Sequence, residues 1–494
     1  MFPDVWWRLC GLSARPAPFE VYRPVYRAPC SRQLATFTIW SCLGRGICYG
    51  VAQVRQIASK CVINNKSVSN PPIVSNRARS YALAILVVVY TLNFVDRQIL
   101  AILLPAIKIE FTLDDWVLGF IAGPAFALFY ATLGVPIALL ADRFSRRNLI
   151  AAAIAIWSVM TALSGMANSV TQLALARIGV GVGEAGCSPP AHSMISDYYP
   201  PEQRSTAMGI YTVGISIGIM IAYLAGGWVV ENIGWRQAFF IVGLPGLILA
   251  LVVRFSVQEP PRGMSENRTD TGDKPGMFEV ARFLLRRKSF LHLAFGAGLA
   301  SFGGYASISF FPSFLVRSHG MSLGQIGVYL GLLYGIGGAI GFAGGGYIAD
   351  KIGRDDKKRS LWGVAIATMI AWVFVFPVML LDDVTWVLTL FFFPIVFSNF
   401  YLATTFAQVQ SMVGLRMRAV ASAFILLILN IIGLGFGPQV TGLLSDLLAA
   451  EFGNESMRYS LLIIGAIVGP WSALHYYFAG RHINEDLARA GDNS

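Results

Sequence analysis

The segment ALLADRFSRRN at residues 138–148 has a near copy, GYIADKIGRDD, at residues 346–356. Each copy follows a long apolar run and joins it to the next one through a short loop rich in Arg, Lys and Asp. A segment that recurs at this distance indicates a duplicated unit. The chain is therefore predicted to consist of two halves of similar architecture.

Apolar runs of about 20 residues, each long enough to cross a bilayer as a helix, recur from about residue 80 onward. Hydrophobic residues make up 55% of the chain and charged residues only 13%, which is too apolar for an ordinary soluble protein. The sequence predicts an all-α membrane protein with twelve transmembrane helices in two six-helix bundles. The predicted spans are residues 80–104, 116–140, 147–167, 170–197, 204–230, 236–256, 289–316, 323–349, 359–380, 385–412, 418–447 and 457–479.

One long polar interruption separates six spans from six. It ends in the amphipathic stretch MFEVARFLLRRKSF, which we expect to lie along the membrane surface. The predicted organisation is an N-terminal extension (1–79), an N-terminal bundle (80–257), a cytoplasmic linker with an amphipathic helix (258–288), a C-terminal bundle (289–480) and a cytoplasmic tail (481–494).

Residues 1–79 are rich in Arg, Cys and Pro and almost without acids. Such a composition is typical of a transit peptide. Our interpretation is that the segment is disordered, or that it is an upstream extension which results from a mis-set start. Five of the six cysteines lie here, without metal-type pair spacing, so we predict neither a zinc site nor a disulfide framework.

The Lys and Arg residues predict the orientation. Loops after even-numbered spans hold 19 of them, whereas loops after odd-numbered spans hold four. By the positive-inside rule both ends of the bundle face the cytoplasm. The net charge of +11 is accordingly interpreted as topology and not as a nucleic-acid surface.

Four charged residues lie inside apolar runs, two in the first span and two in the fourth. A charge at the bilayer centre costs roughly 3 kcal/mol on insertion scales, so these residues need partners or a water-filled cavity. They belong to two polar stripes at helical spacing, which we expect to face a central cavity. The stripes consist of Tyr90, Asn93, Asp96 and Arg97 in the first span and of Arg177, Gly181, Glu184 and Ser188 in the fourth.

Helix geometry predicts which charges pair. At 1.5 Å per residue, Asp96 lies about 24 Å from the cytoplasmic start of its span and Arg177 about 10 Å from the outer start of its own. In a hydrocarbon core about 30 Å thick these heights nearly match, while Glu184 falls about two turns deeper. We expect Arg177 or Arg97 to neutralise Asp96 and to leave Glu184 as the more isolated acid.

Such acids suit proton coupling. Burial favours the neutral form of a carboxylate, whereas a nearby guanidinium favours the ionised form. A conformational change that makes or breaks the pair would then bind or release a proton. The alternative is a static ion pair that holds the first and fourth spans together.

The two loop segments resemble the Gly-x-Leu-Ala-Asp-Arg-x-Gly-Arg motif of the major facilitator superfamily. The first copy has Ala138 and Ser145 at the glycine positions, whereas the second keeps both glycines. Within the superfamily the chain resembles the Spinster branch. The segments that carry this likeness are NFVDR (93–97), RIGVGVGEAGCS (177–188), WRQAF (235–239) and QEPPRG (258–263).

The resemblance covers residues 80–480 and implies two six-helix bundles, alternating access and a lipid substrate. It also implies that Asp96 and Glu184 are the proton-linked acids, with Arg97 and Arg177 beside them. The asparagine, aspartate and arginine of NFVDR also occur in organic-anion symporters, which keeps a second substrate class open.

The C-terminal half offers aromatic and amide side chains but no acid at matching depth. A charged wall that faces such a surface suits an amphiphile with a polar head and an apolar tail. The predicted substrate-cavity residues of both halves are Tyr90, Asn93, Ser188, Phe302, Tyr305, Asn399, Tyr401 and Asn430.

The two loop motifs are predicted to form a cytoplasmic gate, because acids and bases at helix ends can hold neighbouring spans together in one access state. The predicted gate residues are Asp142, Arg143, Arg146, Asp350, Lys351 and Arg354.

We therefore expect a proton-linked secondary transporter of a lysolipid or sphingoid phosphate, or alternatively a proton-coupled symporter of a small organic anion. A membrane sensor or scaffold would need no internal acids. The sequence has no metal-ligand cluster, nucleophile elbow or phosphate loop, so we expect neither an enzyme nor a cofactor. The expected setting is a bacterial inner membrane, with a monomer that interacts with membrane lipids, protons and substrate but not with nucleic acid.

The orientation can be tested with cysteines introduced at Thr269 and Asn454. The first should react with a membrane-impermeant maleimide only from the cytoplasm and the second only from outside, because the Lys and Arg asymmetry is large. Labelling of intact cells and of inverted vesicles measures both, and the reverse pattern would contradict the orientation.

Overall fold

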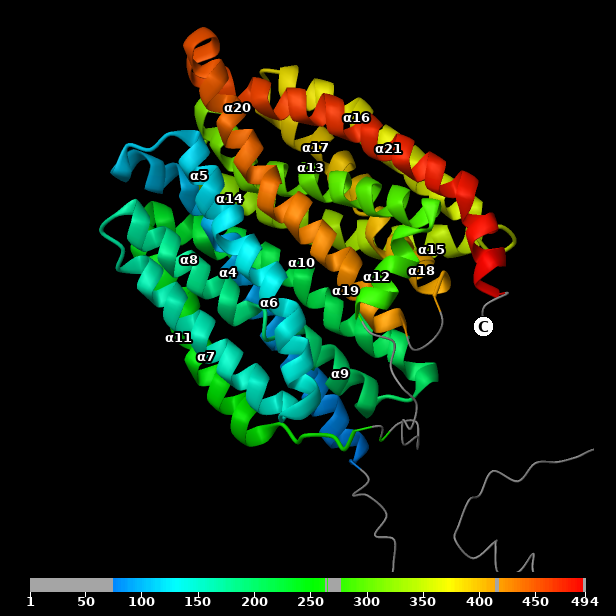
Figure 1. Ribbon diagram of the computed structural model, residues 1–494. Helices are drawn as coiled ribbons and strands as arrows, with labels where there is room; N and C mark the ends of the chain where they lie inside the picture. Colours follow the sequence, from blue (N-terminus) through cyan, green and yellow to red (C-terminus); the bar gives the residue numbers. More distant parts are fainter. Residues whose placement is uncertain (1–73, 263, 265–276, 414–416, 492–494) are drawn as a thin grey trace, which may run out of the picture. The chain divides into compact units, whose positions relative to one another are not determined.

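The computed structural model describes residues 74–262, 264, 277–413 and 417–491. The chain divides into two units, Met1–Ile73 and Val74–Ser494, and the first lies outside the described residues, as does most of the predicted extension. The described part of the second unit is helical and has no strand (Figure 1). The all-α prediction is confirmed.

The described part of the N-terminal half holds eight helical elements. They are α4 (Asn76–Phe111), α5 (Asp115–Ala122), α6 (Pro124–Arg143), α7 (Arg146–Gly165), α8 (Val170–Glu184), α9 (Ser188–Tyr198), α10 (Pro201–Asn232) and α11 (Trp235–Ser256). Serine hydroxyls begin several of them: Ser75, Ser145 and Ser169 each accept a hydrogen bond from the backbone of the first turn. Such capping satisfies amides that have no partner inside the helix.

The C-terminal half begins with the short helix α12 (Met277–Leu285). It continues with α13 (Lys288–His319), α14 (Leu323–Leu332), η1 (Leu333–Gly337), α15 (Gly338–Ile352), α16 (Lys357–Leu380), α17 (Val384–Ser398), α18 (Tyr401–Ser411), α19 (Arg418–Ile428), η3 (Leu429–Phe436), α20 (Gly437–Phe452), η4 (Gly453–Glu455) and α21 (Ser456–Gly491). Val280 and Leu284 of α12 are fully buried against the core of this half, so the amphipathic stretch packs its apolar face on protein.

Ten helical runs in the described chain are long and apolar enough to cross a membrane. One of them, Val420–Ala488, includes the turn at η4, so it consists of two segments, one before η4 and one after it. The segment of α8 and α9 is not among the ten, since a break after Glu184 leaves two short helices. The described chain thus accommodates twelve segments, and twelve membrane crossings stay a prediction.

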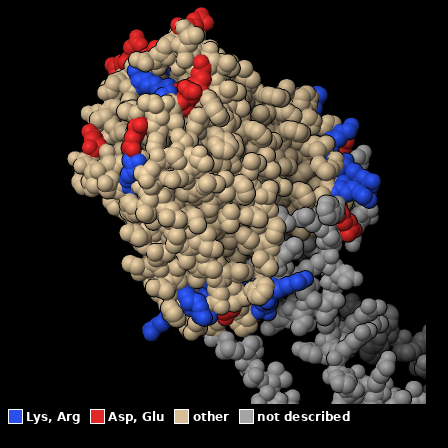
Figure 2. All heavy atoms as spheres, turned by 60° about the vertical axis from the view of Figure 1, so that its left-hand side comes forward, with Lys and Arg blue, Asp and Glu red and all other residues tan. Residues whose placement is uncertain are grey.

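The surface agrees with a membrane setting. Figure 2 shows a wide band without Lys, Arg, Asp or Glu between charged residues at two ends of the bundle. One end, which we call the basic end, holds residues 143–147 and 351–359. The other end holds residues 111–115 and 317–322, and we call it the latch end after the polar contact between the halves that is described below. Large apolar side chains of the helices, such as those of Ile248 in α11 and Trp386 in α17, are exposed, as expected for residues that face lipid.

The two halves meet closely where α10 passes α14. A Cβ atom added at Gly227 would lie 2.6 Å from the carbonyl oxygen of Leu323 in the other half. A Cβ atom added at Gly209, earlier in the same helix, would meet no neighbouring atom within 4 Å. Gly227 therefore lies at a close helix contact, whereas Gly209 does not.

Replacing Gly227 with alanine should separate the two halves at this contact, because backbone atoms cannot move aside as a flexible side chain can. We expect a loss of about 1–3 kcal/mol, observed as a lower melting temperature of the purified protein in detergent. Gly209→Ala is the matched control and should be neutral or slightly stabilising. Equal melting temperatures for both variants would contradict the contact.

Candidate functional site: a buried charge cluster

Helices α4 and α8 bring four charged side chains together inside the N-terminal half. Asp96 and Arg97 lie on α4, while Arg177 and Glu184 lie on α8, and all four are buried. α8 ends at Glu184 because the chain turns through Gly186 and restarts with prolines in the first turn of α9. The last acid of α8 therefore lies at a helix break.

Arg97 and Glu184 form the tighter pair. The Glu184 Oε2 atom accepts hydrogen bonds from Arg97 Nη2 at 2.6 Å and from Nε at 3.1 Å. Both side chains are shielded from solvent, with exposed fractions of 6% and 0%. The expectation that Glu184 would be the more isolated acid is wrong.

The direction of the side chains explains this error. Helical side chains lean toward the N-terminus of their helix, so Arg97 on α4 points back toward the basic end, where Glu184 lies. The prediction compared only the heights of the backbone atoms. It took account neither of the direction of the side chains nor of the length of an arginine. Of the two arginines that could neutralise Asp96, Arg177 does so.

Asp96 is held mainly by a hydroxyl. Thr161 of α7 approaches both carboxylate oxygens, at 2.6 and 2.5 Å, whereas Arg177 Nη1 lies 3.6 Å from Oδ1. Among the described residues, Nε and Nη1 of Arg177 find no hydrogen-bond acceptor. This second pair is looser, and Arg177 keeps unused donors.

Aromatic rings surround both guanidinium groups. Arg97 lies 4.5 Å from the ring centre of Tyr130 and 5.0 Å from those of Phe94 and Phe126, and Arg177 lies 5.4 Å from Phe126. Ring faces stabilise a cation that is shielded from water. These rings and Thr161 were not predicted from the sequence, although Ser158, Thr161 and Ser164 recur at helical spacing on α7 and could have indicated a buried polar face.

The predicted cavity residues divide into two groups. Tyr90, Asn93 and Tyr305 lie with the charges: Asn93 Oδ1 is 3.5 Å from Arg97, Tyr90 stacks on Tyr211 at 4.2 Å, and the Tyr305 hydroxyl comes close to Arg97 from the other half. The remaining predicted residues are partly buried, and Asn399 donates its amide to the Ile395 carbonyl of its own helix. They are Ser188, Phe302, Asn399, Tyr401 and Asn430.

The predicted gate residues also divide. Arg146 is buried and joins three segments of the N-terminal half: it forms an ion pair with Asp197, donates to Ser193 Oγ at 3.0 Å and to the Pro260 carbonyl at 2.7 Å, and binds Glu259 Oε1 at 2.9 Å. The other members with a described side chain are exposed, and that of Asp142 lies outside the description. The exposed members are Arg143, Asp350, Lys351 and Arg354.

Residues 86–438 match the model of the Major Facilitator Superfamily. The chain belongs to this superfamily. An MFS-type efflux pump of Mycolicibacterium smegmatis is 33% identical over 409 residues, which cover 82% of this chain and 94% of the pump. Protein spinster homolog 1 of Homo sapiens is 27% identical and aligns over 82% of this chain and 81% of its own length.

A solved relative places this superfamily member in the Spinster branch. It is a bacterial homologue of the human lysosomal transporter Spinster, in an inward-facing and unoccupied conformation. The two structures agree with a TM-score of 0.75 at 32% sequence identity, over 83% of this chain and 99% of the homologue. The hexuronate transporter of Bacillus subtilis is a more distant relative, at 24% identity over 72% of this chain and 85% of its own length.

A second polar cluster of the transporter joins the halves at the latch end. Buried Asp115 of α5 accepts hydrogen bonds from Arg317 of α13 at 2.5 and 2.7 Å, from Lys108 at 2.5 Å and from Ser445 of α20 at 2.7 Å. Asp446 accepts from the first amides of α5, at 2.9 and 2.7 Å. We call Asp115, Lys108, Arg317, Ser445 and Asp446 the latch, which the sequence analysis missed.

At the basic end, Glu259 holds the start of α7. It accepts hydrogen bonds from Ser145 Oγ at 2.9 Å and from the backbone amides of Arg146 and Arg147 at 3.2 and 2.8 Å. Burial opposes its charge, but these donors and the Arg146 guanidinium together lower the pKa of Glu259 below its usual range. The ionised carboxylate is therefore a structural tie.

Because the pKa of Glu259 is lowered on folding, its stabilisation is present above the ordinary carboxyl range and is lost as the pH falls through the lowered value. Glu259→Gln should cost about 1–3 kcal/mol at pH 7, and the difference from the unaltered protein should shrink below about pH 4. Melting temperatures across this range measure the effect. Glu279→Gln, at an exposed position of α12, is the control, and a pH-independent difference would contradict the tie.

Proposed function

We propose that the chain is a proton-linked secondary transporter that moves an anionic amphiphile, of the lysolipid or sphingoid-phosphate type, by alternating access. The observation that carries this proposal is the buried cluster of two carboxylates and two guanidinium groups on α4 and α8. The basic end is proposed to face the cytoplasm, from the distribution of Lys and Arg. A bacterial inner membrane is the proposed location.

The coupling follows from charge balance. An unpaired charge in a buried site is costly, so a proton that neutralises Glu184 leaves Arg97 in need of another anion. The anionic head of a substrate can supply that charge, and proton and substrate then stabilise each other at the site. Departure of the substrate returns Arg97 to Glu184 and releases the proton.

The second acid extends the same logic. Asp96 is held by a hydroxyl and by a more distant guanidinium, so Arg177 can turn toward an incoming anion at little cost in hydrogen bonds. The hydrogen bond from the Thr161 hydroxyl to Asp96 remains when Arg177 moves. Aromatic rings around both arginines and Tyr305 from the other half offer an apolar surface for a chain attached to the head group.

Small organic anions are a second candidate class, which some of the relatives support. Besides the hexuronate transporter, the chain is 26% identical to a cis,cis-muconate transport protein of Acinetobacter baylyi over 52% of this chain and 63% of that protein. Such a substrate would use the same guanidinium groups without the apolar surface. Competition by substrates with and without an alkyl chain separates the two classes.

Glu184→Gln should abolish accumulation driven by an imposed pH gradient while expression and substrate binding persist, because the amide keeps the shape but cannot exchange a proton. Asp96→Asn should act in the same way with an added loss of stability, since Arg177 loses its buried partner. The measurement is uptake of lysophosphatidic acid and of glucuronate into liposomes. Lysophosphatidic acid should be the one that accumulates.

Glu451→Gln, at an exposed acid far along the chain, is the control and should transport normally. If the Glu184 and Asp96 variants both retain full gradient-driven accumulation, the cluster is structural and the coupling is wrong. If glucuronate alone accumulates, the substrate class is the small organic anion.

A further inference from the structure

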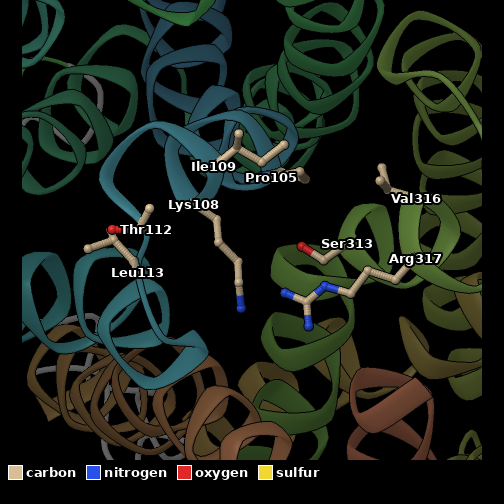
Figure 3. Close-up of a pocket in the computed structure, with 8 residues that line it drawn as sticks. All are labelled: Pro105, Lys108, Ile109, Thr112, Leu113, Ser313, Val316 and Arg317. Atoms are coloured by element: carbon tan, nitrogen blue, oxygen red, sulfur yellow. The ribbon is translucent and has the colours of Figure 1, made fainter. Parts of the chain in front are cut away.

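A pocket of about 360 Å³ lies beside the latch, between the ends of α4 and α13. This volume falls in the range of small-molecule sites. Figure 3 shows that Lys108 and Arg317, which come from opposite halves, both extend into it. Its other walls are mainly apolar, formed by Pro105, Ile109, Leu113 and Val316 together with Thr112.

The residues that line the pocket include two cations and no carboxylate. Lys108 and Arg317 are two cations, and Asp115 is the one carboxylate that they share. Arg317 uses two of its donors on Asp115 and Lys108 uses one, which leaves further N–H groups on each. A second anion can therefore bind beside Asp115 without breaking every bond to it.

A buried hydroxyl is also directed at this space. The Ser313 side chain is 1% exposed, and its Oγ atom has no hydrogen-bond partner among the described residues. Figure 3 shows this oxygen beside the Arg317 guanidinium, directed toward the space into which Lys108 also extends. A buried hydroxyl without a partner is costly in a native protein, unless a ligand or water completes it.

The backbone beside the pocket is unusual too. Thr112, in the pocket wall, has a φ of 49°, and it is the one described residue other than glycine with a positive φ. Branching at Cβ makes this conformation unfavourable for threonine. Strained backbone conformations cluster at binding and catalytic sites, where the surrounding structure holds them in place. Here the strained residue lies beside a pocket with unused hydrogen-bond donors.

We propose that this pocket binds the anionic head group of an amphiphile, a phosphate or carboxylate, with its apolar chain against the aliphatic walls. The head group would accept hydrogen bonds from Lys108, Arg317 and Ser313. It would share both cations with Asp115, so its binding weakens the contact between the halves at the latch. This site is separate from the charge cluster, and its occupation does not depend on the transport proposed above.

Binding can be measured by calorimetry on the full chain in phosphatidylcholine nanodiscs. The probes are octyl phosphate, inorganic phosphate and octyl glucoside, which provide head and chain, head alone and chain alone. We expect octyl phosphate to bind at least tenfold more tightly than either of the others. Equal binding of octyl phosphate and inorganic phosphate would reassign the site to free phosphate and overturn the amphiphile.

Two substitutions isolate this site without touching the latch. Ser313→Ala should weaken binding of octyl phosphate about tenfold, because it removes one hydrogen bond to a charged group. Val316→Trp should abolish this binding by filling the pocket. Octyl phosphate binding that is unchanged in both variants belongs to another site, such as the charge cluster, and would overturn the proposal.

A latch variant tests the coupling in the opposite direction. Asp115→Asn frees Lys108 and Arg317, so octyl phosphate should bind about tenfold more tightly, whereas a pocket unrelated to the latch would show no change.

A distance measurement tests whether binding separates the halves. In the protein with its six cysteines replaced by serine, spin labels on cysteines introduced at Asn168 and Asn454 report the distance between the halves. Octyl phosphate should lengthen it, Val316→Trp should prevent the change, and an unchanged distance would overturn the coupling.

Discussion

Charge that is withdrawn from water must find a partner, and this constraint organises the N-terminal half. Two guanidinium groups and two carboxylates lie where neither lipid nor solvent can neutralise them, so α4 and α8 must stay in register with each other and with Thr161 on α7. The tight pair between Arg97 and Glu184 sets that register, because both hydrogen bonds converge on one oxygen. The looser pair between Asp96 and Arg177 leaves donors in reserve.

The two ends of the bundle hold their segments together differently. At the basic end, Arg146 and Glu259 connect segments within one half. At the latch end, Asp115 ties one half to the other through Arg317. The alternating access proposed above would use this difference, since contacts within a half would persist while contacts between the halves would break.

Much of this architecture could be predicted from the sequence, because apolar length and the repeated loop determine the helices and the halves. The buried charges were also evident, since a charge in an apolar run is rare enough to be noticed. Their pairing was not, because it depends on the direction in which Arg97 leans. The latch was missed for another reason: Asp115 and Arg317 lie at the edges of apolar runs, where charges are ordinary, and 202 residues separate them.

The glycine contact between α10 and α14 bears on how the halves can move. Side chains that interdigitate between two helices fix the angle at which the helices cross. At Gly227 no side chain interdigitates, because the two backbones approach each other directly. Such a contact would let the two halves tilt about it with little repacking of side chains. Resistance to tilting would then come mainly from the hydrogen bonds and ion pairs that join the halves nearby.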